Sequence, residues 1–150
     1  MNETIDKIEN EIVEEFSFFD DWLDKYQYII ELGQKLNGSF PEEKRTDEYK
    51  IKGCQSNLWL TADLDNDRVV FKADSDSSIV KGLVYLMMRV FSGQKPDDIL
   101  NAKLDFLDRI GLKQHLAQTR QNGLSAMIKQ MRMYALAYKL KLHDQKINLN

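Results

Sequence analysis

The fold class of this chain depends on residues 56–73, which read SNLWLTADLDNDRVVFKA. Two runs rich in strand-forming residues, 56–64 and 69–73, lie on either side of the polar run Asp65-Asn66-Asp67-Arg68. A short polar turn between two such runs is typical of a hairpin. The stretch therefore predicts an antiparallel β-hairpin in the middle of the chain.

Helical patterns precede the hairpin. Apolar residues recur from Ile5 to Phe16 at the spacing of one helix face, behind Thr4 as a candidate N-cap. A second helix is expected from about Asp20 to Leu36, where Asn37-Gly38 would end it. Between this helix and the hairpin, we expect a loop at 41–48 and a short strand at 49–51.

Helical patterns also follow the hairpin. Several capping residues at 73–78 precede a helix that is expected to run from Ile79 to Val90. A short helix is expected from Pro96 to Leu100, and a last helix from about Gly123 to Leu142. A small antiparallel sheet with helices from both termini packed against it is an α+β fold.

Composition sets limits on the class of protein. The 150 residues fit a single domain, and 43% hydrophobic with 30% charged residues is typical of a soluble globular protein. A net charge of -3 without a basic stripe argues against nucleic acid as the main partner. No apolar run approaches the ~20 residues of a membrane span, so no membrane is expected. The first residues lack a signal-peptide pattern, and together with a single cysteine this predicts the reducing cytoplasm.

The single cysteine, Cys54, is the main candidate for chemistry. One thiol forms no internal disulfide, and it supplies too few ligands for an iron–sulfur cluster or a structural zinc. Gly53 before it and the polar Gln55 and Ser56 after it predict a turn. A thiol in a turn can act as a nucleophile or as a carrier of sulfur, whereas the alternative is a small buried apolar residue.

Three blocks of sequence form a recognisable pattern. The blocks, in chain order, are Lys52-Gly53-Cys54-Gln55-Ser56-Asn57-Leu58-Trp59-Leu60, then Ala73-Asp74-Ser75-Asp76-Ser77-Ser78-Ile79-Val80-Lys81-Gly82-Leu83 with Gly93 and Pro96, then Gly111-Leu112, His115-Leu116, Arg120-Gln121-Asn122-Gly123-Leu124 and Met127. In these blocks the chain resembles the SufE family of sulfur-acceptor proteins, and the resemblance covers nearly the whole length, from the Trp22–Tyr26 helix to Tyr134. One departure is visible, because residues 116–120 lack the Ser-Pro that family members often carry, which predicts a looser turn ahead of Arg120.

The resemblance implies a compact α+β fold related to the IscU-like scaffold proteins of iron–sulfur assembly. It also implies that Cys54 accepts sulfur as a persulfide from a SufS-type cysteine desulfurase, stimulates that enzyme, and passes sulfur to a SufBCD-type scaffold. Pyridoxal phosphate would belong to the desulfurase, and we expect neither a cofactor nor a metal on this chain. The protein would thus be an accessory to an enzyme and not a stand-alone enzyme.

Further residues are candidates for shaping the cysteine loop or for binding the partner. Asp74, Ser75 and Asp76 are expected to cap the following helix, and they can also shape a pocket over the thiol. At the last helix, Asn122 is the expected N-cap, with Gly123 after it. The resemblance makes Arg120 a docking residue for the desulfurase, where its guanidinium grips a carboxylate or a carbonyl.

Other functions remain open from the sequence. The chain can be a carrier for a paralogous desulfurase that feeds a thiolation pathway without clusters, or a cluster scaffold. It can also be a stand-alone cysteine enzyme, although neither His115 nor His143 shows triad spacing to Cys54, or an interaction module with an inert thiol. For the carrier, we expect a loop that shelters the sulfur at rest and swings outward on docking.

Overall fold

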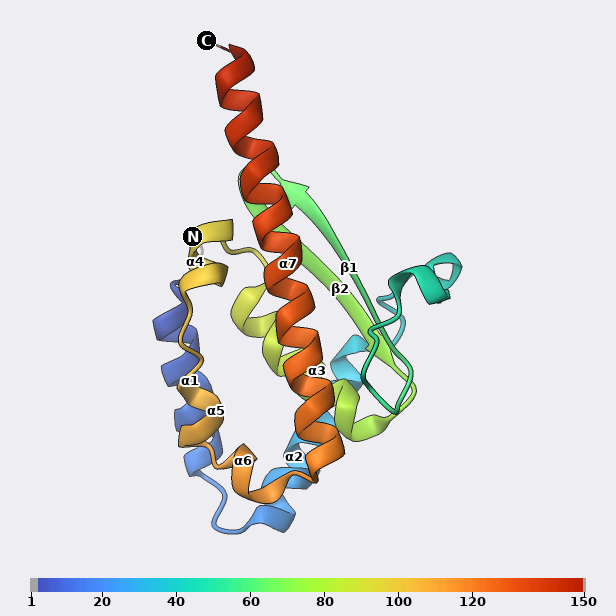
Figure 1. Ribbon diagram of the computed structural model, residues 1–150. Helices are drawn as coiled ribbons and strands as arrows, with labels where there is room; N and C mark the ends of the chain where they lie inside the picture. Colours follow the sequence, from blue (N-terminus) through green and yellow to red (C-terminus); the bar gives the residue numbers. More distant parts are fainter. Residues whose placement is uncertain (1–2, 150) are drawn as a thin grey trace.

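The computed structural model describes residues 3–149, which contain seven α-helices and one β-hairpin at one side of the helices (Figure 1). The strands are β1 (Leu58–Asp65) and β2 (Arg68–Ser75). The helices are α1 (Ile5–Ser17), α2 (Trp22–Gly33), α3 (Ser78–Phe91), α4 (Pro96–Asn101), α5 (Phe106–Arg109), α6 (Leu112–His115) and α7 (Gln118–Leu149). Short 3-10 turns are η1 (Gln34–Leu36), η2 (Glu42–Lys44) and η3 (Asp47–Tyr49). No described helix is both long enough and apolar enough to cross a bilayer.

The hairpin confirms the prediction from residues 56–73. β1 and β2 pair antiparallel in a register that runs from Leu58 opposite Ser75 to Asp65 opposite Arg68. Two residues remain in the turn, and Asn66 adopts a left-handed φ of 57°, which asparagine tolerates better than most residues. The two-stranded antiparallel sheet with its helices establishes the predicted α+β class.

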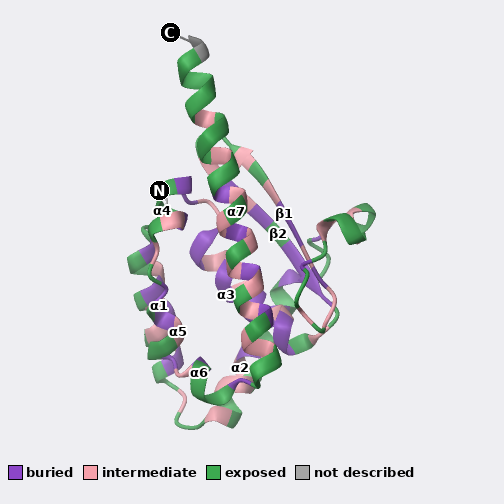
Figure 2. Cartoon of the chain, in the orientation of Figure 1, coloured by how far each residue is buried: buried purple, intermediate pink, exposed green. Residues whose placement is uncertain are grey.

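Helix α3 lies at the centre of the molecule, against the hairpin, α2 and α7. Most of its side chains are buried, whereas the surrounding helices keep one exposed face (Figure 2). The crossing with α2 depends on glycine, because a Cβ added at Gly82 would lie 2.0 Å from the carbonyl oxygen of Ile29. The backbones therefore approach more closely than any side chain permits, and this contact fixes α3 against α2.

Helix α7 spans 32 residues and packs about its first two thirds against the hairpin, α3 and α4. Its buried stripe includes Met127, Met131 and Ala135. The Tyr138 hydroxyl donates to the Ala62 carbonyl of β1 at 2.7 Å, which fixes the helix against the sheet. Beyond this point the helix continues past the rest of the molecule (Figure 1).

The helix boundaries correct three expectations. Helix α7 begins at Gln118 and not at Gly123, because the amides of Arg120 and Gln121 both donate to the Ala117 carbonyl and start the helix earlier. Asn122 is therefore not an N-cap but a residue of the first helical turns. The expected strand at 49–51 is reduced to one bridge, Lys50 with Trp59, because Tyr49 is the last residue of η3.

The turn at 116–120, which lacks the family's proline, is held by hydrogen bonds from a side chain. The Gln121 side chain donates to the carbonyls of Lys113 and Leu116, at 3.0 and 2.9 Å. Glutamine thus holds this turn with two hydrogen bonds where other family members often carry a proline ring.

Candidate functional site

Cys54 lies on a loop that is anchored at both ends. At the first end, the Ile51 amide donates to the Leu58 carbonyl at 2.8 Å. At the second, the Asn57 amide and side chain donate to the Asp76 carboxylate at 3.1 and 2.7 Å, and the Ser75 hydroxyl donates to the Asn57 carbonyl at 2.7 Å. The anchors leave residues 52–56 as the segment without backbone pairing to the hairpin.

The loop rests directly on α7. Gly53 has a φ of 89°, in the left-handed region that glycine adopts without strain, and a Cβ there would lie 3.7 Å from Ala126 of α7. A Cβ added at Gly123 would lie 3.0 Å from the Cys54 Sγ. The sulfur therefore packs against bare helix backbone, in a space that a larger residue at position 123 would occupy.

The thiol forms part of the wall of a pocket of about 220 Å³. Buried apolar residues make its floor, and more exposed residues make its rim. The full lining is Cys54, Gln55, Ser56, Leu58, Val80, Leu83, Val84, Ala117, Thr119, Arg120, Gly123, Leu124 and Met127. One water occupies about 30 Å³ of liquid, so the pocket has room for an additional sulfur atom on Cys54, about 2 Å from Sγ.

Arg120 is the cationic residue in this lining. Its Nη1 donates to the Ser77 hydroxyl at 3.4 Å, a long and weak hydrogen bond. Among residues 3–149, no carboxylate lies within 4.0 Å of the guanidinium, so Arg120 forms no salt bridge within this part of the chain. The other nearby cations, Lys50 and Lys52, line a separate depression beside Tyr134.

The expectation that Asp74, Ser75 and Asp76 cap α3 is wrong, because the Ser77 side chain accepts from the Val80 amide in that role. Asp76 and Ser75 instead hold the cysteine loop through Asn57. None of the three lines the pocket, so they shape it indirectly.

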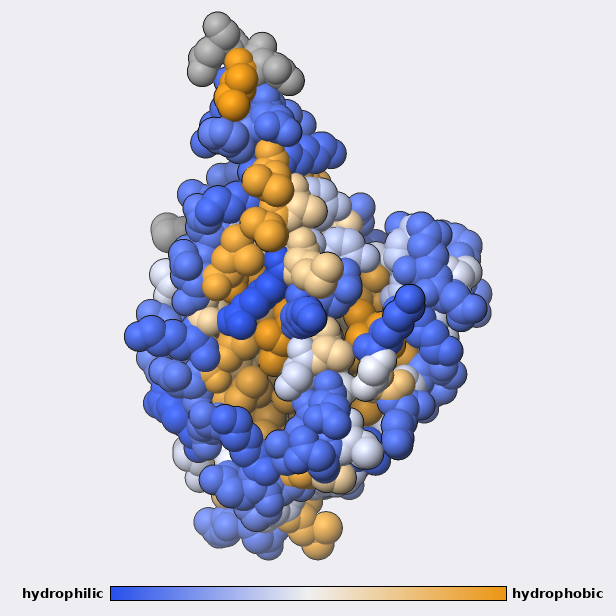
Figure 3. Space-filling view, in the orientation of Figure 1, coloured by the Kyte–Doolittle hydropathy of each residue, from blue (hydrophilic) through white to orange (hydrophobic). Residues whose placement is uncertain are grey.

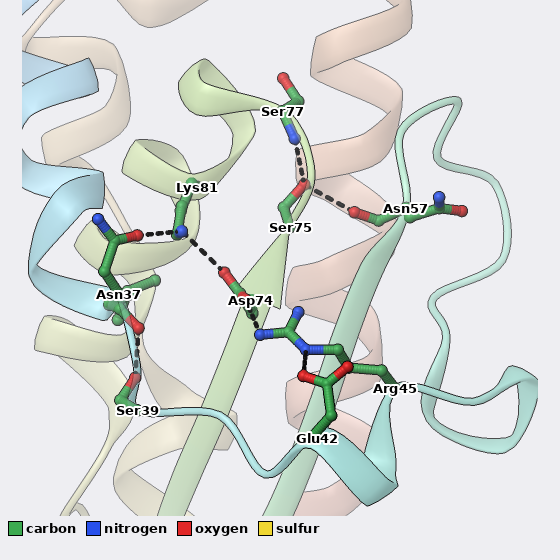
Figure 4. A network of polar contacts seen from close by, with 10 residues as sticks. Asn37, Ser39, Glu42, Arg45, Asn57, Asp74, Ser75, Ser77 and Lys81 are labelled. Atoms are coloured by element: carbon green, nitrogen blue, oxygen red, sulfur yellow. Dashed lines mark hydrogen bonds and ion pairs between the residues drawn. The ribbon is translucent and has the colours of Figure 1, made fainter.

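Asp74 is the centre of a buried ion network next to the loop anchor (Figure 4). Its carboxylate lies 2.5 Å from Arg45 Nη2 and 3.3 Å from Lys81 Nζ. Burial works to raise the pKa of Asp74, but the bonds from Arg45, the Ser75 amide and Lys81 outweigh it and hold that pKa below its usual value. The network joins the η2 segment to β2 and α3, because Arg45 also pairs with Glu42.

The structure separates the remaining predicted residues from the thiol. Asn122 is exposed outside the pocket lining, and its side chain accepts from Gln118 at 2.9 Å. His115 stacks on Trp22 with ring centroids 4.4 Å apart, and His143 is exposed on α7. Within residues 3–149, no group of three or more His, Cys, Asp or Glu side chains is arranged to hold a metal ion.

Sequence reasoning missed two parts of this site. The first is Asn57, the residue that ties the loop to Asp76, although it stands within the cysteine block. The second is the apolar floor, to which α3 contributes Val80, Leu83 and Val84. A signal for the floor was present, since Val84 adds apolar surface on a second side of α3.

The fold and the site together define an α+β protein that carries a single thiol on an anchored loop, packed against a helix at the wall of a small pocket. This chain belongs to the SufE family. The family model described as SufE, Fe-S metabolism associated domain, matches residues 10–135. Membership associates the protein with iron–sulfur metabolism and confirms the resemblance found in the three sequence blocks.

Similar proteins agree with this assignment. An uncharacterized SufE-like protein of Rhizobium meliloti is 40% identical over 131 residues, covering 84% of this chain and 93% of the relative. Another, from Synechocystis, is 35% identical over 129 residues, covering 86% and 80%. A hypothetical protein from Thermus thermophilus, solved in solution, has a TM-score of 0.72 at 18% identity over 89% of this chain and 96% of its own. That likeness concerns the fold alone.

Proposed function

We propose that this protein accepts sulfur from a SufS-type cysteine desulfurase on Cys54, stimulates that enzyme by removing its persulfide, and delivers the sulfur to a SufBCD-type scaffold. The Cys54 thiolate attacks the outer sulfur of the donor's persulfide. One S–S bond forms on Cys54, the donor's S–S bond breaks, and the donor cysteine leaves as a thiolate, so no external oxidant or reductant is needed. Pyridoxal phosphate chemistry belongs to the desulfurase.

The contact between Cys54 Sγ and Gly123, at the wall of the pocket, is the observation that carries this proposal. A persulfide exposed to solvent is lost to thiols and oxidants, so a carrier needs shelter between its two transfers. The apolar floor supplies shelter, and the short unpaired segment 52–56 supplies a part of the chain that can leave α7 when the donor docks. A reducing cytoplasm would make such shelter necessary.

Intact mass measurement tests the transfer. The protein is incubated with cysteine desulfurase and free cysteine, and the expected result is an added mass of one sulfur, about 32 Da, as thiol exchange requires. Cys54→Ser is the control and should gain nothing. Stimulation of the desulfurase by Cys54→Ser at the wild-type level would contradict the carrier role and favour an inert interaction module.

Arg120 is the proposed docking residue at the rim. Arg120→Ala should raise the concentration of this protein that gives half-maximal desulfurase stimulation, because a bidentate partner is lost. Its single long bond to Ser77 predicts a stability change within about 0.5 kcal/mol. Arg120→Lys is the matched control, since it keeps the charge but not the planar fork. Unchanged stimulation by both variants would remove Arg120 from the docking site.

A further inference from the structure

Helix α7 carries a second apolar stripe that faces solvent. Four large side chains are about half exposed: Met133 at 54%, Leu136 at 48%, Leu140 at 56% and Ile147 at 56%. The stripe lies about 170° around the helix from the buried stripe of Met127, Met131 and Ala135, as the pitch of 3.6 residues per turn requires. Figure 3 shows apolar surface along the projecting part of this helix.

The spacing of the stripe is that of a coiled coil. Met133, Leu140 and Ile147 follow one another at seven-residue intervals, and Leu136 lies three residues after the first of them. In heptad notation Met133, Leu140 and Ile147 occupy a positions, and Leu136 occupies the first d position. His143 occupies the second d position. Met133 lies within the match to the SufE family, which ends at residue 135, whereas Leu136, Leu140 and Ile147 lie beyond it. Most of the stripe is therefore outside the shared domain.

Charge on the two flanks of the stripe selects a partner and a direction. The g positions are basic, with Arg132, Lys139 and Lys146, whereas the e position of the second heptad is Asp144. Parallel pairing of two identical helices places Lys139 of one copy beside Asp144 of the other, twice by symmetry. Antiparallel pairing would place the basic g flanks against each other, which is unfavourable.

We propose that the exposed stripe of α7 pairs with the same stripe of a second copy, as a short parallel coiled coil. The buried stripe that packs against the body lies on the opposite side of α7, so the two bodies point outward. At the start of the exposed stripe, Met133 also borders the depression lined by Lys50 and Lys52. Met133 lies ten residues, about 15 Å of helix, beyond Gly123, which leaves the Cys54 pocket outside the seam. The interaction is independent of the proposed sulfur transfer.

Sedimentation equilibrium of the full chain, at concentrations up to about 1 mM, tests self-association. The expected result is a concentration-dependent rise toward twice the 17.6 kDa mass of one chain. Leu140→Glu should raise the dissociation constant by at least about tenfold, because it places a charge at the centre of the seam. Gln145→Glu is the matched control, since it adds the same charge on the same helix outside the stripe.

Two further variants test the core position at His143 and the ion pair between Lys139 and Asp144. His143→Leu should tighten the dimer by about tenfold, because it replaces a polar residue at a core position. Asp144→Lys should weaken the dimer, and adding Lys139→Glu should restore it by exchanging the two charges of the pair. Lys139 also lies 2.7 Å from Asp97 of its own chain, but that exposed contact contributes little.

Three results would overturn the proposal. One is a single-chain mass at every concentration for both wild type and His143→Leu. Another is equal dimerisation of Leu140→Glu and Gln145→Glu. The third is failure of the charge exchange to restore association, which would exclude the parallel arrangement. A monomer whose desulfurase complex is weakened by Leu140→Glu would assign the stripe to that enzyme instead.

Discussion

Substituting alanine for Gly123 tests whether the resting thiol is held against α7. The new Cβ would lie 3.0 Å from the Cys54 Sγ, whereas comfortable contacts between such atoms are about 3.5–4.0 Å. The sulfur must therefore retreat by about 0.5–1 Å. Gly123 belongs to helix α7, whereas Cys54 lies in the loop segment 52–56, which has no backbone pairing to the hairpin. We therefore expect the loop to move away from α7 while the helix keeps its position.

The expected effect of Gly123→Ala on stability follows from two opposing contributions. Alanine in place of glycine inside a helix stabilises by about 0.8–1 kcal/mol. Loss of packing for a half-buried thiol and its loop costs about 1 kcal/mol locally. Global stability should then stay within about 1 kcal/mol of wild type, while the local opening of the loop becomes about fivefold more frequent.

Alkylation of Cys54 by iodoacetamide, followed by intact mass, measures this opening. We expect Gly123→Ala to react about fivefold faster than wild type in buffer and at the same rate in denaturant. Ser125→Ala is the matched control, because Ser125 is an exposed residue of the same helix outside the pocket lining. A rate for Gly123→Ala equal to that of the control would refute the contact between sulfur and helix.

Three further changes test the elements that position the site. Asp76→Ala removes both hydrogen bonds to Asn57, so it should lower the free energy of unfolding, measured with urea, by about 1–2 kcal/mol. It should also speed alkylation of the Cys54 thiol. Alkylation at the wild-type rate would show that the loop does not need this anchor. Asp74→Ala should cost about 2–3 kcal/mol at pH 7. Because the folded pKa of Asp74 lies below its unfolded value, this difference from wild type should shrink as pH falls below about 4, and a constant difference would contradict the ion network. Gly82→Ala drives a Cβ to 2.0 Å from the Ile29 oxygen, so it should destabilise by more than about 3 kcal/mol, measured as a fall in Tm; a fall of only one or two degrees would contradict the close crossing.

The hairpin was predictable because the residues that determine it lie close together in the sequence. Strand formers and the turn at 65–68 lie within one short stretch, and the observed register closes at Asp65 opposite Arg68. The start of α7 was not predictable from capping preferences alone. Asn122 has the right side chain for an N-cap, but the carbonyl of Ala117 accepts the first helical bonds instead.

The site was predictable only in part, because its contacts join distant segments. The three sequence blocks named Cys54, Arg120 and Gly123, which do line one pocket. They did not reveal that Gly123 is small to admit the sulfur, since that requires the loop and α7 to be placed together. The role of Asp76 was misassigned for the same reason, because its partner Asn57 lies 19 residues away in the chain.

The paired anchors at Ile51 and Asn57 also set how far the sulfur can travel. Cys54 stands three residues from each of them, and three extended residues span at most about 11 Å. While both anchors hold, the Cys54 thiol is tethered within that radius. The proposed transfer therefore requires a donor that brings its own sulfur to the surface of this protein on a projecting segment, and it requires the same of a recipient.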